Sequence, residues 1–453
     1  MIESGTIFGW SVLAKVPLRK WLAVLTVVAA SALSVERVQA QVPSRPNILV
    51  MIVDDMGWAD LGVQGSIDAP TPNIDSIAKD GVRLTNAYVS APVCSPSRAG
   101  LLTGRYQTRF GHELNHPMAD RGPVGLPVEE QLWPVYFKNA GYVTGHAGKW
   151  HLGNTQMTQF TPNARGFQDS YHFAGAQKLP HPKLPYSHNG KPEQSDEAYV
   201  DDGIAASACQ FINSHKSEPW FFYTAFLTPH EPMDLPNGVE DRFSGTAEVK
   251  RRKFLAAMSL MDADVGRILK TLKETGQDER TLVIFLSDNG APTGNGSLNT
   301  PFQGSKSTLW EGGIRSPFLI RWTGSLPAGG VLDQPVISLD LLATALSAAK
   351  IPASSDHPLD GVNLLPLLKG ETTAAPHEFL FWRYGDQWAV RSGNWKLVHA
   401  GKAKEAFATR LVNLQDDLSE AHDLSEQHPE IRARLQTAWD DWNRSNVPAL
   451  WGK

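Results

Sequence analysis

Four apolar segments, each followed by polar residues, constrain the fold most. They are residues 47–53 (NILVMIV) before Asp54-Asp55, 141–144 before Lys149 and His151, 220–227 (WFFYTAFL) before His230, and 281–286 (TLVIFL) before Asp288-Asn289. Strands that are apolar without alternation are typical of a sheet buried on both faces. Helical patterns lie between them, which indicates an α/β sheet. Because ligands bind beyond the carboxyl ends of such strands, we expect these polar residues to meet at one edge.

The clearest helical pattern lies in residues 254–272. Apolar residues recur there every three or four positions, and Gly276 follows the last of them. This spacing predicts one helix with a single buried face. Asp262 and Asp264 lie in the same segment, and no metal-binding motif accompanies them. We therefore expect both carboxylates to be solvated.

The pattern changes after about residue 350. Residues 351–358 are rich in Pro, Ser and Asp and are typical of a linker, and residues 379–399 contain short aromatic strands separated by turns. Residues 429–443 look helical, with Pro429 suited to the first turn. We expect a main domain over residues 41–355. A C-terminal subdomain over residues 356–453 would hold a small antiparallel sheet and a packed helix.

The first forty residues have the pattern of a secretory signal peptide. A positive flank (Lys15, Arg19 and Lys20) precedes the apolar residues 21–35, and small residues stand at the cleavage positions of Val38-Gln39-Ala40. The alternative is a membrane anchor, but a span needs about 20 apolar residues. We expect residues 1–40 to be removed after Ala40, and the chain to be exported to the periplasm or the medium without stable membrane insertion.

Charge and cysteine content exclude some classes of protein. The formal net charge is −5, which argues against a nucleic-acid partner. Only two cysteines occur, Cys94 and Cys209, fewer than an exported protein stabilised by disulfides would carry. One disulfide between them is an alternative, but Cys94 lies in a polar run. Cys209 lies in an apolar helical context typical of a buried residue.

Asp54, Asp55, Asp288 and Asn289 supply three carboxylates and one amide. Hard oxygen ligands of this kind suit calcium or magnesium rather than zinc. A single Asp-Asp pair is more often a loop or helix cap. Two such pairs, each following a buried strand, favour a metal site.

Cys94 begins a run with Pro96 near its start and Gly104 at its end, which predicts a short helix over residues 96–102. A helix N-terminus favours an anion and lowers the pKa of a thiol. The residues alone therefore indicate an activated cysteine beside a metal and an anion site.

The run CSPSR (residues 94–98), followed by AGLLTG (99–104), resembles the signature of the type I sulfatases in the alkaline phosphatase superfamily. Four further runs resemble family motifs and occur in the family's order. They are GKWHLG (148–153), TPHEP (228–232), SDNG (287–290) and GSKSTLWEGG (304–313). The resemblance implies a large mixed, mostly parallel sheet sandwiched by helices, with a small C-terminal antiparallel sheet and helix. Residues 41–355 would be the catalytic domain.

The resemblance also implies a sulfuric ester hydrolase that depends on calcium. In this family a maturation enzyme oxidises the cysteine, here Cys94, to formylglycine (3-oxoalanine), and the hydrated aldehyde is the nucleophile. One Ca²⁺ per chain would be held by Asp54, Asp55, Asp288, Asn289 and an oxygen of the modified Cys94.

The remaining motif residues receive roles in the same way. Lys149, Lys306 and Arg98 would neutralise the sulfate and the charge of the transition state, and Arg98 would also orient the hydrate. His230 and Lys306 would protonate the leaving sugar oxygen. His151 would take a proton from the second hydroxyl of the hydrate.

The likeness to bacterial polysaccharide and N-acetylgalactosamine-type sulfatases implies a sulfated carbohydrate as substrate. Two sets of residues are candidates to surround it. Close to Cys94 are Arg105, Arg109, His112, Glu113, Asn115 and His116, either facing the sugar and a second anion or forming a polar surface loop. Farther along the chain are residues 177–194, Arg383, Tyr384, Asp386 and Trp388.

Two other functions remain open. A phosphoesterase of the same superfamily, such as a phosphonate monoester hydrolase, can share the modified cysteine. A catalytically silent glycan-binding protein would be exported with Cys94 unmodified.

Overall fold

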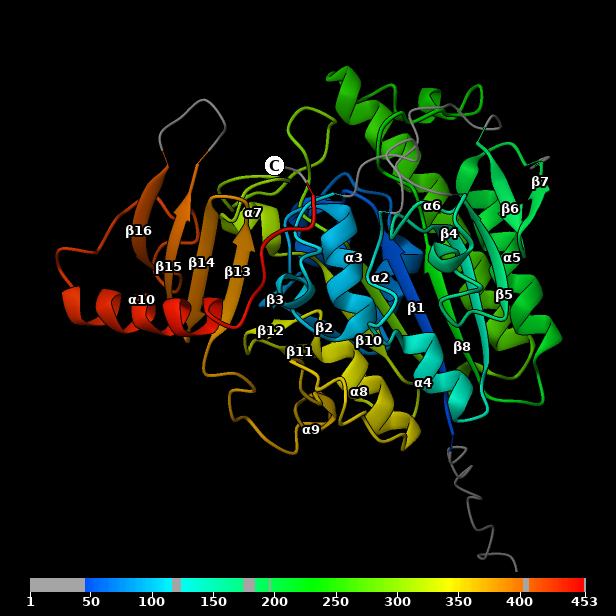
Figure 1. Cartoon of the computed structure of the whole chain (residues 1–453). Helices are drawn as coiled ribbons and strands as arrows, with labels where there is room; N and C mark the ends of the chain where they lie inside the picture. Colours follow the sequence, from blue (N-terminus) through cyan, green and yellow to red (C-terminus); the bar gives the residue numbers. More distant parts are fainter. Residues whose placement is uncertain (1–44, 116–123, 174–183, 195–196, 402–406, 452–453) are drawn as a thin grey trace, which may run out of the picture. The chain divides into compact units, whose positions relative to one another are not determined.

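The computed structural model describes residues 45–115, 124–173, 184–194, 197–401 and 407–451 (Figure 1). The signal-peptide prediction, His116 and residues 177–183 lie outside these ranges. No helix among the described residues is long and apolar enough to cross a membrane.

A ten-stranded sheet forms the centre of the fold, in the order β11-β2-β10-β9-β1-β8-β4-β5-β6-β7. Its strands are β1 (Asn47–Val53), β2 (Val82–Leu84), β4 (Val143–Lys149), β5 (Asp169–Phe173), β6 (Tyr186–His188), β7 (Lys191–Glu193), β8 (Trp220–Ala225), β9 (Thr281–Ser287), β10 (Phe318–Arg321) and β11 (Gly330–Leu332). The four predicted strands β9, β1, β8 and β4 are parallel neighbours, and β5 continues them. Strands β10, β6 and β7 pair antiparallel with their neighbours, so the sheet is mixed and mostly parallel, as expected.

Helices cover both faces of this sheet, which explains its continuous apolar strands. They are α2 (Pro72–Lys79), α3 (Cys94–Thr103), α4 (Trp133–Asn139), α5 (Val200–Ser214), α6 (Val249–Glu274), α7 (Glu311–Ile314), α8 (Asp340–Ala349) and α9 (Leu365–Leu368). Alternate residues of β1 enter two different cores. Ile48 packs with residues of α3, α4 and α8, whereas Leu49 packs with residues of α2, α5 and α6.

The α6 helix confirms the predicted buried face, but the expectation that Asp262 and Asp264 are solvated is wrong. Asp262 is 3% exposed and accepts the backbone N–H groups of Asn73 and Ile74 at the start of α2. Asp264 is 1% exposed and pairs with Arg267 at 2.9 Å. Because α2 and α5 both pack on α6, the flanks of its apolar face are covered as well.

The C-terminal region forms the expected small antiparallel sheet. Its strands are β13 (Leu380–Tyr384), β14 (Gln387–Ser392), β15 (Trp395–Ala400) and β16 (Ala408–Asn413), and α10 (Pro429–Asn443) packs on it through a small apolar core. A two-stranded sheet pairs β3 (Ala87–Tyr88) with β12 (Val336–Ile337). The core that contains Ile48 also contains Trp382 of β13. The division between residues 355 and 356 stays a prediction.

Buried charges also join the C-terminal sheet to helix α7 and the segment before it. Lys396 Nζ donates to Glu311 Oε1 at 2.8 Å, to Glu420 Oε1 at 2.8 Å and to the Leu309 carbonyl at 2.9 Å. Arg315 contacts Glu311 from the other side. We call Lys396, Glu311, Glu420 and Arg315 the Lys396 cluster.

Candidate active site

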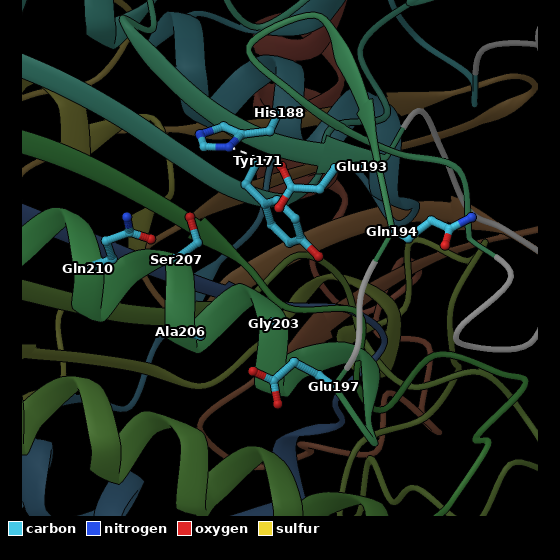
Figure 2. A pocket seen from close by; sticks show the side chains of 9 residues that line it. All are labelled: Tyr171, His188, Glu193, Gln194, Glu197, Gly203, Ala206, Ser207 and Gln210. Carbon is cyan, nitrogen blue, oxygen red and sulfur yellow. Dashed lines mark ion pairs between the residues drawn. The ribbon is translucent and has the colours of Figure 1, made fainter.

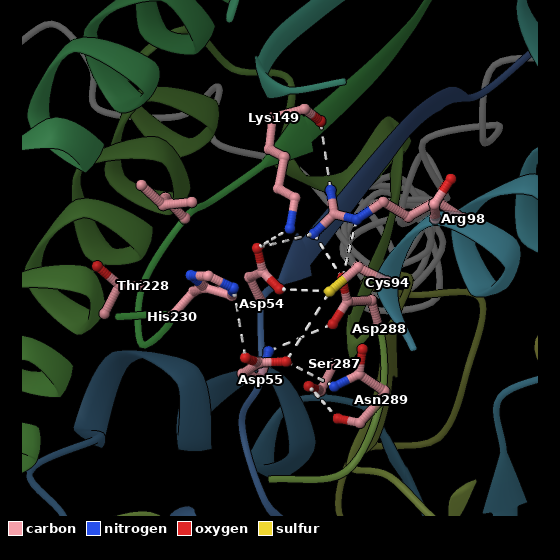
Figure 3. A network of polar contacts seen from close by, with 12 residues as sticks. Asp54, Asp55, Cys94, Arg98, Lys149, Thr228, His230, Ser287, Asp288 and Asn289 are labelled. Carbon is pink, nitrogen blue, oxygen red and sulfur yellow. Dashed lines mark hydrogen bonds and ion pairs between the residues drawn. The ribbon is translucent and has the colours of Figure 1, made fainter. Parts of the chain in front are cut away.

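Residues from distant parts of the sequence meet beyond the carboxyl ends of the central strands (Figure 3). Asp54 and Asp55 follow β1, Asp288 follows β9, and Cys94 is the first residue of α3. Their side chains offer oxygen or sulfur atoms that all lie within 4.8 Å of one another. The rule that strand ends deliver ligands to one edge therefore holds for this sheet.

Cations surround these four side chains. Cys94 Sγ lies 3.2 Å from Asp54 Oδ1 and 3.3 Å from Lys306 Nζ. Lys306 Nζ lies 2.6 Å from Asp55 Oδ1, and Lys149, the last residue of β4, pairs with Asp54. We call Asp54, Asp55, Cys94, Asp288, Arg98, Lys149 and Lys306 the Cys94 cluster. It combines three carboxylates with three cations.

Arg98 is fully buried, and its guanidinium faces the protein. Nε and Nη2 lie 2.8 and 2.7 Å from Asp288 Oδ2, and Nη1 donates to the Lys149 carbonyl at 3.3 Å. Burial alone would lower the pKa of Arg98, but Asp288, Asp54 and the other acidic neighbours together outweigh burial and raise the pKa. Arg98 therefore links the Asp288 carboxylate to the end of β4.

The carboxylates of the cluster differ in pKa. Burial raises the pKa of Asp54, but Lys149, His230 and the other cations outweigh burial and hold it well below its usual range. Burial and the charge of Asp54 raise the pKa of Asp288 to about 6. The direct contact with Lys149 thus favours the ionised form of Asp54.

The sequence-based expectation of a lowered thiol pKa is wrong for Cys94. Burial, followed by the charges of Asp288 and Asp54, raises the pKa of this thiol well above its usual value. The residue stands at the start of α3 as expected, but it is 1% exposed, and burial with the nearby carboxylates raises the pKa despite the helix N-terminus. Since the thiolate is the nucleophilic form of cysteine, an unmodified Cys94 is not activated here.

The side chains present fit a hard divalent cation. Asn289 Nδ2 donates to Asp55 Oδ1 at 2.7 Å, while Asn289 Oδ1 is buried and accepts no hydrogen bond within the described parts of the chain. Buried polar oxygens normally have a partner. Three carboxylates and one amide oxygen form the donor set that calcium prefers.

Two histidines flank the Cys94 cluster. His230 Nε2 lies 3.7 Å from Asp55 Oδ2, and the imidazole is 18% exposed. His151 follows β4 by two residues, and the Ser95 hydroxyl donates to its carbonyl at 2.7 Å. Because Ser95 neighbours Cys94, this bond places His151 beside the start of α3.

Left-handed backbone is concentrated at this site. Six described residues other than glycine have positive φ, and three of them are Asp55 (70°), His151 (55°) and Ser307 (72°). This conformation costs an L-residue about 1–2 kcal/mol, and such residues cluster at functional sites. Surrounding contacts must therefore hold all three segments in place.

Several residues considered for the substrate pocket bind the protein instead. Arg105 pairs with Glu130 at 2.7 Å, and Arg109 pairs with Asp360 at 2.6 Å. These contacts favour the alternative of a polar loop over a second anion site. The other members of this group have protein partners too: Glu113 with Arg383, Asn115 with Ser95, His112 with Ser95, and Trp388 with Trp439.

Sequence reasoning missed two residues with direct contacts to the site, Ser95 and Gln387. Ser95 was visible only as part of the CSPSR run. Gln387 donates to the Ser307 carbonyl from β14, 80 residues away in sequence. No local sequence pattern predicts a contact between residues so far apart in the chain.

A separate polar cavity of about 420 Å³ lies between α5 and strands β5–β7 (Figure 2). His188 pairs there with Asp169 at 2.9 Å and with Glu193 at 3.0 Å. No member of the Cys94 cluster lines this cavity.

Known proteins and family models match most of this chain. The family model described as Sulfatase matches residues 46–351, and that described as N-sulphoglucosamine sulphohydrolase, C-terminal, matches residues 304–444. The N-acetylgalactosamine-6-sulfatase of Canis lupus familiaris is 35% identical over 387 residues, which cover 79% of this chain and 72% of that protein.

Two solved structures resemble this chain in fold. Ps i-CgsB in complex with k-i-k-neocarrahexaose has a TM-score of 0.83 and 30% identity, over 90% of this chain and 94% of that one. The phosphonate monoester hydrolase SpPMH from Silicibacter pomeroyi has a TM-score of 0.66 and 19% identity, over 89% of this chain and 96% of that one. At that identity the second likeness shows a shared fold only.

Proposed function

This chain belongs to the sulfatase family, and from that membership we propose that it hydrolyses sulfate esters of carbohydrates, with a formylglycine made from Cys94 and a bound calcium ion. The observation that carries the proposal is the convergence of ligand atoms from Asp54, Asp55, Cys94 and Asp288 within 4.8 Å. Cations line the same site, as a sulfate group requires.

Asp54, Asp55, Asp288 and Asn289 would hold the calcium ion. When bound, it would act as a Lewis acid on a sulfate oxygen and stabilise the nucleophilic oxygen. Arg98 would keep Asp288 in position for this role. The unpartnered Oδ1 of Asn289 supports a ligand role for the amide.

Cys94 would be oxidised by a maturation enzyme before it is used. Its side chain lies 3.2 Å from Asp54 and 3.3 Å from Lys306, inside the proposed donor set. The hydrated aldehyde supplies two hydroxyl groups, one to attack sulfur and one to expel sulfate afterwards. The raised pKa of the thiol agrees with a residue that does not act as cysteine.

Lys149 and Lys306 would hold the sulfate oxygens, because each ammonium reaches the centre of the Cys94 cluster. His230, with Lys306, would donate a proton to the leaving sugar oxygen as the bond from sulfur to that oxygen breaks. His151 would accept the proton of the hydroxyl that does not carry sulfate. The Arg98 guanidinium contacts Asp288 and the Lys149 carbonyl, so its proposed contribution is to orient the site.

We propose a sulfated carbohydrate as substrate and polysaccharide degradation as the setting. A relative's name states action on N-acetylgalactosamine 6-sulfate, and a solved neighbour is in complex with a neocarrahexaose. Both are carbohydrates, which supports this class over lipid or steroid sulfates.

The decisive experiment measures sulfate release by matured protein from defined sulfated mono- and disaccharides. A preference for an aryl phosphate diester over an aryl sulfate would contradict the proposal in favour of a phosphoesterase. Mass spectrometry of the peptide with Cys94 tests maturation, and an unmodified thiol in native-host protein would favour a silent glycan-binding protein. Activity that survives complete calcium removal would rule out the metal site.

We also propose that residues 1–40 are a signal peptide and that the protein acts in the periplasm or outside the cell. The mature chain would consist of a catalytic domain (41–355) and a C-terminal subdomain (356–453). N-terminal sequencing of secreted protein should begin at Gln41, and a start at Met1 would contradict the cleavage.

A further inference from the structure

The tip of the β13–β14 hairpin reaches the turn that carries Lys306. Tyr384 and Gln387 pair across the two strands, with Gly385 and Asp386 forming the tip. Gln387, which follows the tip, contacts Ser307 and Leu309, on the C-terminal side of Lys306. The C-terminal sheet is therefore in contact with a loop of the Cys94 cluster.

Gln387 uses both ends of its amide on this turn. Nε2 donates to the Ser307 carbonyl at 2.9 Å, and Oε1 accepts the N–H of Leu309 at 3.2 Å. The residue is 6% exposed. Ser307 has the left-handed φ of 72°, which these contacts hold in place.

The other anchors of the turn belong to the proposed catalytic segments. The Lys306 N–H donates to the Ala291 carbonyl at 2.9 Å, two residues after Asn289. The Ser307 N–H donates to the Pro92 carbonyl at 2.9 Å, two residues before Cys94. Gln387 supplies the contact from the side of the C-terminal sheet, so the turn is fixed from three directions.

The hairpin tip is itself fixed to the segment that follows α3. Glu113 accepts the Gly385 N–H at 3.0 Å with one carboxylate oxygen and pairs with Arg383 at 2.7 Å through the other. Glu113 is 4% exposed. A rigid chain of contacts thus runs from the segment after α3, through the hairpin tip, to the Lys306 turn.

We propose that Gln387 is a positioning residue that holds the Lys306 ammonium at the reaction centre. This inference rests on the proposed function of the site. Lys306 Nζ lies 2.6 Å from Asp55 and 3.3 Å from Cys94 Sγ, so a small shift of the turn moves a cation out of contact. Misplacement of a catalytic group by about 1 Å can lower a rate by about 10²-fold. The C-terminal sheet is accordingly a functional part of the site.

The test replaces Gln387 by leucine, which keeps the size of the side chain and removes both hydrogen bonds. We expect kcat for a sugar sulfate to fall by about 10- to 10²-fold. The loss for nitrophenyl sulfate should be smaller, because nitrophenolate leaves without the proton that Lys306 helps to deliver. Gln415→Leu, an exposed glutamine of the same C-terminal region, is the matched control and should behave as wild type.

A double variant separates positioning from general damage. In a Lys306→Ala background, Gln387→Leu should cause little further loss, because the group it positions is gone. An equal loss in both backgrounds, or wild-type kcat for Gln387→Leu, would overturn the inference. If Gln387→Leu does not fold, Gln387→Glu serves instead. Its carboxylate can still accept the N–H of Leu309, but it places a second oxygen, which cannot donate, next to the Ser307 carbonyl.

The proposed function fails in a different way. Wild-type protein that releases no sulfate would contradict the function itself, and a Lys306→Ala variant with full activity would contradict the proposed role of Lys306. If Lys306→Ala lowers kcat but Gln387→Leu leaves kcat unchanged, only the positioning role of Gln387 is contradicted.

Discussion

The charges of the Lys396 cluster and of the Cys94 cluster are all fully or nearly buried, but the two clusters differ in how completely their atoms are paired. In the Lys396 cluster, Lys396 Nζ has three acceptors, and both oxygens of Glu420 accept hydrogen bonds, from Lys396 and from the Glu311 backbone. Glu311 likewise accepts from Lys396 and from the Tyr88 hydroxyl. The cluster joins the C-terminal sheet to α7, and Lys396, Glu311 and Glu420 are closed to solvent.

The Cys94 cluster is built from the same types of residue but is incomplete. The Oδ1 atom of the neighbouring Asn289 accepts no hydrogen bond from any described residue, and Lys306 and His230 remain 16% and 18% exposed. Asp55 and Ser307 have left-handed backbone. Buried charge alone is therefore a poor sign of function. An unpaired ligand atom and an opening to solvent distinguish the proposed active site from a structural junction, whereas left-handed backbone occurs in both, since Glu420 of the Lys396 cluster also has a positive φ.

The largest expected effect follows from removing Cys94. Cys94→Ala should lower kcat for an aryl sulfate by at least about 10⁴-fold, as loss of a covalent nucleophile does, while the free energy of unfolding changes by less than about 2 kcal/mol. Activity assays and urea unfolding measure both quantities. Cys209→Ala, at a partly exposed position of α5, is the control and should keep full activity. Substantial activity in Cys94→Ala would place the nucleophile elsewhere.

Lys396→Met should show the opposite behaviour. It leaves Glu311 and Glu420 buried without their common cation, so the free energy of unfolding should fall by about 3–5 kcal/mol. The kcat of the folded fraction should fall far less than in Cys94→Ala. Urea unfolding midpoints test this, and an unchanged midpoint would mean that the junction does not stabilise the fold.

Asp264 is a third case for this comparison: a buried carboxylate with two carboxylates, Asp201 and Asp202, and one cation, Arg267, acting on it. Burial, with the charges of Asp201 and Asp202, raises its pKa in the folded protein to about 8, against an ordinary value of 3.8. Between about pH 4 and pH 8 the folded protein keeps a proton that the unfolded chain has lost. The free energy of unfolding should therefore decrease as pH rises through this window.

Asp264→Asn should flatten that pH dependence, because the amide cannot ionise. Urea unfolding at pH 5 and pH 8 measures the slope for wild type and variant, with the exposed Asp386→Asn as control. Equal slopes in wild type and Asp264→Asn would contradict the raised pKa.

The smallest effect is expected at the partly exposed pair Arg105–Glu130. Such pairs contribute about 0.2–1 kcal/mol, so Arg105→Gln should change stability by no more than that. It should also leave kcat/KM for sulfated sugars unchanged, because Arg105 is already paired. If Arg105→Gln lowers kcat/KM only for a disulfated sugar, Arg105 does belong to a second anion site, which was the other interpretation of the sequence.

Much of the fold follows from local patterns. The segments 47–53, 220–227 and 281–286 became central strands, and the helix predicted over 429–443 is α10. Runs that are apolar on both faces, or on one helical face, leave few other ways to bury their side chains. The strand β4 extends to Lys149, well past the apolar residues 141–144, because small residues (Gly145, Ala147 and Gly148) continue it without an apolar signal.

The environment of individual charges was less predictable. Asp262 and Asp264 lie on a helix whose flanks a sequence would assign to solvent, and only the packing of α2 and α5 buries them. The thiol of Cys94 has the helix N-terminus that the sequence predicts, yet burial and the neighbouring carboxylates raise its pKa instead of lowering it. Such shifts depend on residues that are distant in sequence.

The sequence by itself determined the sheet, the strand ends at which polar residues gather and the motif order that identifies the sulfatase family. Each depends on short-range periodicity or on contiguous residues. The tertiary structure alone decided which charges are paired and which atoms are left over, and it brought Gln387 and Glu113 to the turn and hairpin around Lys306. The physical reason is that hydrogen bonding and burial are set by whatever packs nearby, and most of those neighbours are far away along the chain.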